Sequence, residues 1–162
     1  MDTLFLDRDG VINKKLDGLY VRKWEEFQFM PKAQEALVIL NKIFKRIIIV
    51  TNQQGIGKGI MSEQELSFLH EKMIQVIVNL NIKIDRIYHC PHLASVNCLC
   101  RKPAPGMLEQ AIRDFPDIRL EKSYLIGDSD TDIQAGESVG LHTVKVSNEF
   151  TLYDWAQGLI AI

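Results

Sequence analysis

Acidic, hydroxyl and basic side chains follow the apolar runs of this sequence at points where strands would end. Asp7 and Asp9 come after the first run, Thr51 closes the second, and Asp128 follows a later one. Lys102 stands just before a helical pattern, so it should reach the same place. Because ligands bind beyond the carboxyl ends of parallel strands, these side chains are expected to converge. Each residue alone has an ordinary structural explanation. A site is predicted because each of them occurs at the same position within its strand–helix unit.

Phosphoryl transfer is the chemistry that such a set can perform. Grouped carboxylates repel one another unless a cation lies among them, and their hard oxygens suit Mg²⁺. One carboxylate can attack phosphorus and form an aspartyl phosphate. A second carboxylate can protonate the leaving oxygen and later activate water. The hydroxyl of Thr51 and the ammonium of Lys102 would stabilise charge on the transferring phosphoryl oxygens.

A second group of potential ligands is the cysteine loop, in which Cys90, Cys98 and Cys100 lie close to His92. In extended backbone, residues two apart point the same way, so Cys90 pairs with His92 and Cys98 with Cys100. Three thiolates and an imidazole make a closed tetrahedral zinc site, which would be structural. His89 is a rival ligand, but it should point away from Cys90. Reduced cysteines without a metal are the alternative.

Short apolar runs alternate with helical patterns along the chain. Strands are expected at residues 3–6, 47–50, 84–88, 123–126 and 143–146, and helices at 31–44, 62–80, 104–115, 130–139 and 152–160. Residues 52–61 are rich in glycine and predict a flexible loop. Ser62 and Glu65 form a capping box at the start of the second helix. The alternation predicts the α/β class, with a doubly wound, parallel, five-stranded Rossmann-like sheet.

The composition restricts the class of protein. The 162 residues suit one domain spanning 1–162. Hydrophobic residues make up 46% and the net charge is -2, so disorder is excluded and nucleic acid or an anionic membrane is not an expected partner. The apolar runs are too short to span a bilayer, and no signal-peptide pattern is visible. We therefore expect a cytoplasmic monomer that acts on a small molecule.

The order of the motifs DRDG, TN, RKP and GDSDTD resembles that of the haloacid dehalogenase-like phosphatases. The resemblance covers residues 3 to about 146. It implies that Asp7 is the nucleophile, which forms an aspartyl phosphate, and that Asp9 is the general acid and base. It also implies that Thr51 and Lys102 bind the phosphoryl group.

The same resemblance implies a Mg²⁺ site made by Asp7, Asp128 and the main-chain carbonyl of Asp9. Asp132 is similar to the family's second acid, and it either binds the metal or supports a ligand. The gaps between the motifs leave no room for a separate cap domain. The fold is therefore expected to be capless, with a shallow site roofed by residues 13–24 and the cysteine loop.

The cysteine loop narrows the resemblance to a zinc-containing branch, whose members act on D-glycero-D-manno-heptose 1,7-bisphosphate or on histidinol phosphate. The stretches GLYVRKWEEFQFMP, TNQQGIGKG and KPAPGML are closer to the heptose enzymes. The resemblance thus implies removal of the 7-phosphate in activated heptose biosynthesis, with Asn52, Gln53 and Arg101 binding substrate. The planar fork of Arg101 suits a second phosphate group.

Two departures from the heptose pattern keep alternatives open. The short gap between His92 and Cys98 resembles the histidinol enzymes, and Ser129 stands where both enzymes often have a basic residue. Histidinol-phosphate phosphatase of histidine biosynthesis is the alternative within the family. A catalytically silent, zinc-stabilised binding module is the alternative of another class, and intact Thr51 and Lys102 argue against it. A nucleic-acid end phosphatase is disfavoured, because no basic stripe with interleaved aromatics is present.

Overall fold

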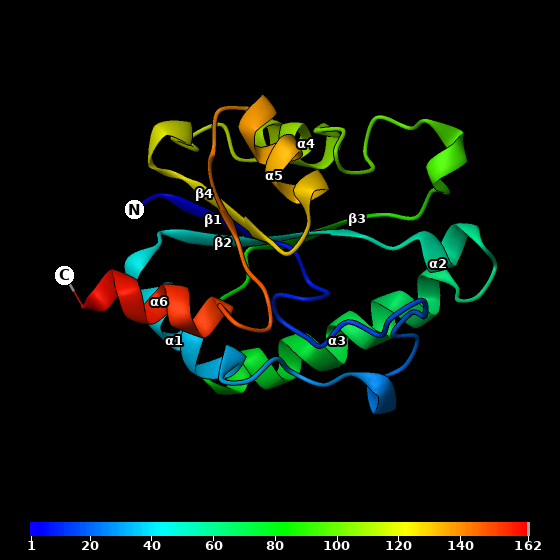
Figure 1. Cartoon of the computed structure of the whole chain (residues 1–162), viewed down its shortest axis with the longest axis horizontal. Helices are drawn as coiled ribbons and strands as arrows, with labels where there is room; N and C mark the ends of the chain where they lie inside the picture. The colour runs from blue at the N-terminus through cyan, green and yellow to red at the C-terminus, as the bar shows by residue number, and fades with distance from the viewer. Residues whose placement is uncertain (162) are drawn as a thin grey trace.

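The computed structural model describes residues 1–161, in which a parallel sheet lies between two layers of helices (Figure 1). The strands are β1 (Thr3–Leu6), β2 (Arg46–Asn52), β3 (Arg86–Cys90), β4 (Tyr124–Gly127) and β5 (His142–Lys145). They lie in the order β3-β2-β1-β4-β5, and every neighbouring pair is parallel. The chain reverses its direction of winding between β1 and β4, where ligands bind in open sheets.

Helices cover both faces of the sheet. The lower layer in Figure 1 consists of α1 (Ala33–Ile43), α3 (Glu63–Asn79) and α6 (Leu152–Ile160). The upper layer consists of α4 (Gly106–Asp114) and α5 (Asp130–Ser138). The short α2 (Gln54–Gly57) follows β2, and 3₁₀ turns occur at Trp24–Glu26, Ala94–Val96 and Leu120–Lys122.

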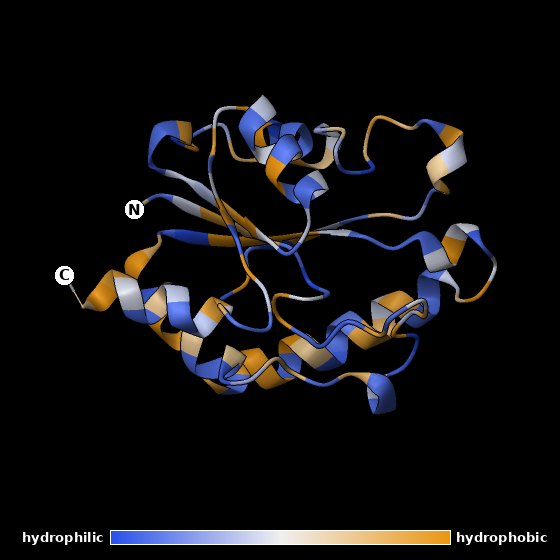
Figure 2. Cartoon of the chain, viewed as in Figure 1, coloured by the Kyte–Doolittle hydropathy of each residue, from blue (hydrophilic) through white to orange (hydrophobic). Residues whose placement is uncertain are grey.

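The side chains of the strands divide the apolar core into two clusters. Leu4 and Leu6 of β1 belong to a buried cluster that includes residues of α1, α3 and α6. Phe5, which lies between them, belongs to a cluster with Leu108 of α4 and Ala135 of α5. The central strands are therefore hydrophobic on both faces, whereas each helix mixes apolar and polar residues (Figure 2). Burial on both faces is the reason that these strands appear as continuous apolar runs in the sequence.

The predicted fold class is confirmed, and the differences are local. The segment 52–61 contains the helix α2, so it is not only a loop. The third strand begins at Arg86, later than expected, because the Asp85 side chain accepts the Ile47 N–H at 3.0 Å. Ser62 and Glu65 form the predicted capping box. Within residues 1–161, no helix is long and apolar enough to cross a bilayer.

Helix α5 begins directly after β4, and two features fix its position. Ser129 is its N-cap, and the Asp132 carboxylate accepts hydrogen bonds from the Ser129 N–H at 3.2 Å and hydroxyl at 2.9 Å. Gly136 allows the helix to approach the sheet closely. A Cβ at this position would lie 2.7 Å from Thr143 Cγ2 and 3.2 Å from Leu125 Cβ. The close packing holds the first turn of α5 at the edge of the sheet.

Replacement of Gly136 by alanine should therefore destabilise the fold. We expect Gly136→Ala to lower the free energy of unfolding by about 1–3 kcal/mol, because the added methyl overpacks the α5–sheet contact. Gly158→Ala in α6 is the matched control, since nothing lies within 4 Å of its Cβ position. That change should raise stability by about 0.5–1 kcal/mol. Urea unfolding of both variants measures the difference, and equal effects would contradict the packing argument.

Candidate active site

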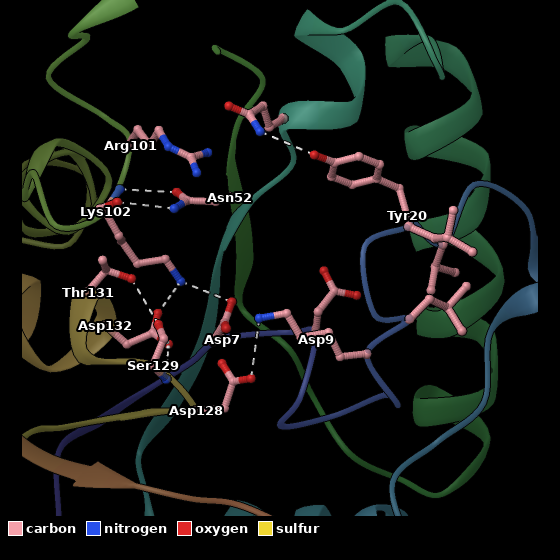
Figure 3. A pocket seen from close by; sticks show the side chains of 15 residues that line it. Asp7, Asp9, Tyr20, Asn52, Arg101, Lys102, Asp128, Ser129, Thr131 and Asp132 are labelled. Carbon is pink, nitrogen blue, oxygen red and sulfur yellow. Dashed lines mark hydrogen bonds and ion pairs between the residues drawn. The ribbon is translucent and has the colours of Figure 1, made fainter. Parts of the chain in front are cut away.

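A cavity of about 240 Å³ opens at the carboxyl ends of β1, β2 and β4. Its lining consists of Asp7, Asp9, Lys15, Leu16, Leu19, Tyr20, Val21, Asn52, Gln54, Arg101, Lys102, Asp128, Ser129, Thr131 and Asp132. Figure 3 shows Asp7 and Asp132 pointing toward the ammonium group of Lys102, with Asp128 close by. The structure thus brings together Asp7, Asp128 and Lys102, as the sequence predicted.

The ammonium group of Lys102 forms the centre of this floor. Its Nζ donates to Asp7 Oδ1 at 2.9 Å and to the Val50 carbonyl at 2.9 Å. It also forms an ion pair with Asp132 Oδ1 at 2.6 Å. Burial acts to lower the pKa of Lys102, but the carboxylates of Asp7 and Asp132 raise it above its usual range. Lys102 therefore stays protonated and joins the end of β1 to the start of α5.

Asn52 positions the backbone of Lys102. The Asn52 side-chain amide donates to the Lys102 carbonyl at 3.3 Å, and its oxygen accepts the Lys102 N–H at 3.1 Å. This paired contact joins the end of β2 to the segment before α4 (Figure 3). Asn52 was expected to bind substrate. It lines the cavity, and its side-chain polar atoms hold Lys102 in place.

The acidic groups of the floor suit a divalent cation. Asp7, Asp128 and Asp132 each offer an oxygen, and these atoms lie within 4.8 Å of one another. Burial raises the pKa of Asp7 to about 8; Lys102 opposes this rise, and the charges of Asp132 and Asp9 add to it. Carboxylates this close together repel one another when all are ionised. A divalent cation that prefers hard oxygen ligands removes this repulsion by binding between them. The donor set therefore fits Mg²⁺.

The DRDG motif brings Asp128 close to the β1 loop. Gly10 has a φ of +86°, and a Cβ there would lie 2.1 Å from Asp128 Oδ2. A residue with a side chain would displace this carboxylate, so the glycine is required for the close approach. On its exposed side Asp128 forms an ion pair with Lys15 Nζ at 3.6 Å.

Asp9 lies in a different environment from Asp7. Its Oδ1 accepts hydrogen bonds from Arg8 at 2.8 Å and Asn13 at 2.9 Å, and its Oδ2 accepts one from Gln53 at 2.8 Å. Burial acts to raise the pKa of Asp9, but the charge of Arg8 and these hydrogen bonds lower it overall. The two acids of the motif are thus held in opposite electrostatic states.

The structure places Gln53 and Thr51 beneath the cavity surface. Both side chains are buried, and neither lines the cavity. Gln53 Nε2 donates to Thr51 Oγ1 at 2.9 Å as well as to Asp9. The expected substrate contact of Gln53 is therefore corrected to a contact that supports Asp9. The next residue, Gln54, is the one that reaches the cavity, because the chain turns into α2 at this point.

The predicted cysteine cluster forms beside this site. Cys90 Sγ lies 3.0 Å from Cys100 Sγ and 3.6 Å from Cys98 Sγ, and His92 Nδ1 lies 3.2 Å from Cys100 Sγ. These S–S distances exceed a disulfide bond, and the sulfur and nitrogen donors are those of tetrahedral zinc sites. His89, the rival ligand, instead pairs with Glu63 at 2.7 Å.

Tyr20, which belongs to the expected roof of residues 13–24, lines the cavity beside Gln54, which the sequence analysis did not assign to the site. The Tyr20 hydroxyl accepts a hydrogen bond from Gln54 at 3.2 Å, and Lys58 Nζ lies 5.3 Å from the Tyr20 ring centre. Arg101, which was predicted, is half-buried and lies across the cavity from Tyr20 (Figure 3). Tyr20 lies in the stretch GLYVRKWEEFQFMP, whose only signal was its similarity to the heptose enzymes. No periodic pattern in the sequence indicates a role for Gln54.

A buried Arg8–His70 contact lies behind Asp9. Arg8 Nη1 lies 3.0 Å from His70 Nε2 of α3, and both residues are buried. Burial, together with the charges of Arg8 and His89, lowers the pKa of His70 to about 3. The folded protein therefore keeps this imidazole neutral at pH values where an unfolded chain would protonate it.

Comparisons with known proteins identify relatives of this chain. Residues 99–159 match the family model described as HAD-hydrolase-like. The D-glycero-alpha-D-manno-heptose-1,7-bisphosphate 7-phosphatase of Mycobacterium bovis is 40% identical over 84% of this chain and 72% of its own length. The crystal structure of the D,D-heptose 1,7-bisphosphate phosphatase from B. bronchiseptica, complexed with magnesium and phosphate, has a TM-score of 0.89, 29% identity and 99% coverage of both chains. The bifunctional histidine biosynthesis protein of Blochmanniella floridana is 35% identical over 88% of this chain and 40% of its own length.

The neutral state of His70 predicts a pH dependence of stability. Because the pKa of His70 is lowered from 6.5 to about 3, the unfolded chain binds a proton between these values that the folded protein does not. This contribution is fully present above pH 6.5 and is lost as the pH falls, with a slope of at most about 1.4 kcal/mol per pH unit.

Urea unfolding of the wild type and His70→Gln at neutral and acidic pH measures this effect. The wild type should lose more stability than the variant between about pH 6.5 and pH 4.5. Parallel losses in the two proteins would contradict a neutral, buried His70.

Proposed function

The chain belongs to the haloacid dehalogenase-like hydrolases, and we propose that it is a Mg²⁺-dependent phosphatase that removes the 7-phosphate from D-glycero-D-manno-heptose 1,7-bisphosphate in activated heptose biosynthesis. The observation that carries this proposal is the contact of Asp7 with Lys102 in a cavity lined by further carboxylates. The similarity to heptose bisphosphate phosphatases supports the choice of substrate.

The first chemical step forms a phosphoenzyme. Lys102 holds Asp7 Oδ1, and the second carboxylate oxygen attacks phosphorus. The negative charge of a bound phosphate raises the pKa of the neighbouring Asp9 carboxyl group, so Asp9 carries a proton in the substrate complex. The bond between phosphorus and the sugar oxygen breaks, and Asp9 gives this proton to that oxygen, so the sugar leaves as an alcohol. Lys102 compensates negative charge on the transferring phosphoryl group. Thr51 was expected to bind that group as well, but its hydroxyl lies beneath the cavity surface and accepts a hydrogen bond from Gln53, so we assign it a supporting role.

The second step hydrolyses the aspartyl phosphate. Asp9, now a carboxylate, accepts a proton from water as the water oxygen attacks phosphorus. The bond between phosphorus and the Asp7 oxygen breaks, and inorganic phosphate leaves. We assign Asp7, Asp128 and the main-chain carbonyl of Asp9 as ligands for Mg²⁺, with Asp132 held beside them by Lys102. When bound, the cation supplies positive charge that stabilises the phosphoryl oxygens.

The mouth of the cavity favours a substrate with a second phosphate. Arg101 lines the cavity, and Lys58 lies near the same entrance beside Tyr20. A second phosphate dianion requires cationic partners, whereas the amine of histidinol would favour an acidic entrance. The histidine biosynthesis relative keeps histidinol phosphate as the second candidate. We further propose a single-domain, cytoplasmic monomer that contacts neither nucleic acid nor membrane.

We propose that the cysteine cluster binds a structural Zn²⁺ through Cys90, His92, Cys98 and Cys100. Four protein ligands fill a tetrahedral shell, so the ion would have no open position for substrate. The loop continues from Cys100 directly into Arg101 and Lys102. The Gly106 N–H, at the start of α4, donates to the Leu99 carbonyl at 2.8 Å. A metal in the loop would therefore fix the segment that delivers both basic side chains.

Substrate choice is tested by phosphate release from heptose 1,7-bisphosphate and histidinol phosphate, side by side. Charge-assisted hydrogen bonds to phosphate contribute about 1.5–3 kcal/mol each. The loss of two such bonds in Arg101→Ala should lower kcat/KM for the bisphosphate about 10²–10⁴-fold. The loss should be small for a heptose monophosphate that lacks the distal group. Arg113→Ala, an exposed arginine on α4, is the matched control.

Two results would contradict this assignment. A higher kcat/KM for histidinol phosphate would show that the short gap between His92 and Cys98 was the correct signal. An equal loss of kcat/KM on the bisphosphate and the monophosphate in Arg101→Ala would show that Arg101 does not contact the distal phosphate.

The two proposed metals should separate in a chelation experiment. Weak chelation should abolish activity, and added Mg²⁺ should restore it, because the carboxylate site is open to solvent. Zinc should stay bound at about one ion per chain under the same conditions, because a closed site releases its ion slowly. Elemental analysis beside the activity assay measures both. A folded, fully active preparation without zinc would refute the structural zinc site.

A further inference from the structure

Arg8 is a buried charge that the proposed chemistry does not use. Its relative exposure is 0%, although it lies between the two catalytic acids in the sequence. One guanidinium nitrogen donates to Asp9 Oδ1 at 2.8 Å, and another lies 3.0 Å from His70 Nε2. Among the described residues, Arg8 Nε has no hydrogen-bond partner.

This arrangement is a poor way to stabilise a fold. A buried ion pair loses the hydration of both charges, and an apolar pair of similar volume is often as stable or more so. An unpaired buried N–H adds a further desolvation cost. The position of Arg8 therefore requires an explanation other than stability, and its contact with Asp9 supplies one.

His70 can accept this hydrogen bond in one way only. A guanidinium group only donates, so the Nε2 atom of His70 must carry its lone pair and Nδ1 its proton. The imidazole is fixed on α3 between Leu69 and Glu71, and Leu69 is fully buried in the core. The helix thereby sets the position of the ring, the ring sets the plane of the Arg8 guanidinium, and the guanidinium sets Asp9.

The hydrogen bonds of Asp9 distinguish its two oxygens. Oδ1 accepts from both Arg8 and Asn13, whereas Oδ2 accepts only from Gln53. Each carboxylate oxygen has two lone pairs, so Oδ2 keeps one free. A proton that Asp9 carries therefore belongs on Oδ2.

We propose that Arg8 and His70 are positioning residues that fix the Asp9 carboxyl group so that Oδ2 delivers its proton to the leaving oxygen. The inference rests on the proposed function, in which Asp9 is the general acid. His70, which is distant in the sequence, thereby acts together with the DRDG motif to position Asp9.

The dependence on the leaving group separates this role from a merely structural one. A sugar alkoxide needs a proton as it leaves, whereas p-nitrophenolate leaves readily without one. The value of kcat/KM reports the steps up to phosphoryl transfer, before the aspartyl phosphate is hydrolysed. A misplaced Asp9 should therefore lower kcat/KM for heptose 1,7-bisphosphate much more than for p-nitrophenyl phosphate. General damage to the site lowers both equally.

The experiment measures kcat/KM on both substrates for the full chain with Mg²⁺. His70→Leu should lose about 10–10²-fold on the bisphosphate, within the range of general acid catalysis, and less than about threefold on p-nitrophenyl phosphate. His70→Gln, which keeps an acceptor for Arg8, should recover most of the loss. Leu69→Val is the matched control for a small loss of stability on the same helix and should show no such selectivity.

Arg8→Lys provides a second route if His70→Leu does not fold. It keeps the charge but cannot contact Asp9 and His70 together, so it should show the same selective loss. Equal losses on both substrates, or no rescue by His70→Gln, would overturn the positioning role. Asp9→Ala tests the underlying mechanism separately. If kcat/KM on the bisphosphate in this variant equals that of the wild type, the proposed function itself is contradicted.

Discussion

Carboxylates from β1 and from the start of α5 approach each other in a buried site, and this is possible because a cation lies between them. Lys102 Nζ contacts Asp7 and Asp132 at 2.9 and 2.6 Å, and it also contacts the Val50 carbonyl. Several parts of the fold serve to bring this one ammonium group to the edge of the sheet. Asn52 holds its backbone, and the cysteine loop leads directly into it.

Asp7 and Asp9, which are two residues apart in the sequence, have pKa values that are shifted in opposite directions. Burial raises the pKa of Asp7 to about 8, while Arg8 and two amide side chains lower the pKa of Asp9. Asp7 faces the acidic floor of the cavity, so a divalent cation there would favour its ionised, nucleophilic form. Asp9 is held from the interior, where the donors fix its orientation. The different neighbours of Asp7 and Asp9 therefore produce two chemically different carboxyl groups.

The sequence predicted those parts of the structure that depend on local patterns. Apolar runs located the strands, and the residues after the runs located the acids, because the ends of parallel strands share one edge. The roles of Gln53 and Gln54 could not be predicted, since they depend on where α2 begins to turn. The contact between Arg8 and His70 joins the loop after β1 to α3, and no local pattern reports a contact between residues so far apart. A buried arginine has the same sequence signal as an exposed one.

The central claim is that Asp7, held by Lys102, is the nucleophile that forms a covalent phosphoenzyme. The most direct measurement is an acid quench during turnover of the bisphosphate, followed by borohydride reduction and peptide mass spectrometry. An aspartyl phosphate at Asp7 is reduced to homoserine, so the account predicts homoserine at position 7 only in the presence of substrate. A folded Asp7→Asn protein should give neither the label nor phosphate release. Substantial turnover by that variant, or a label at another carboxylate, would contradict the account.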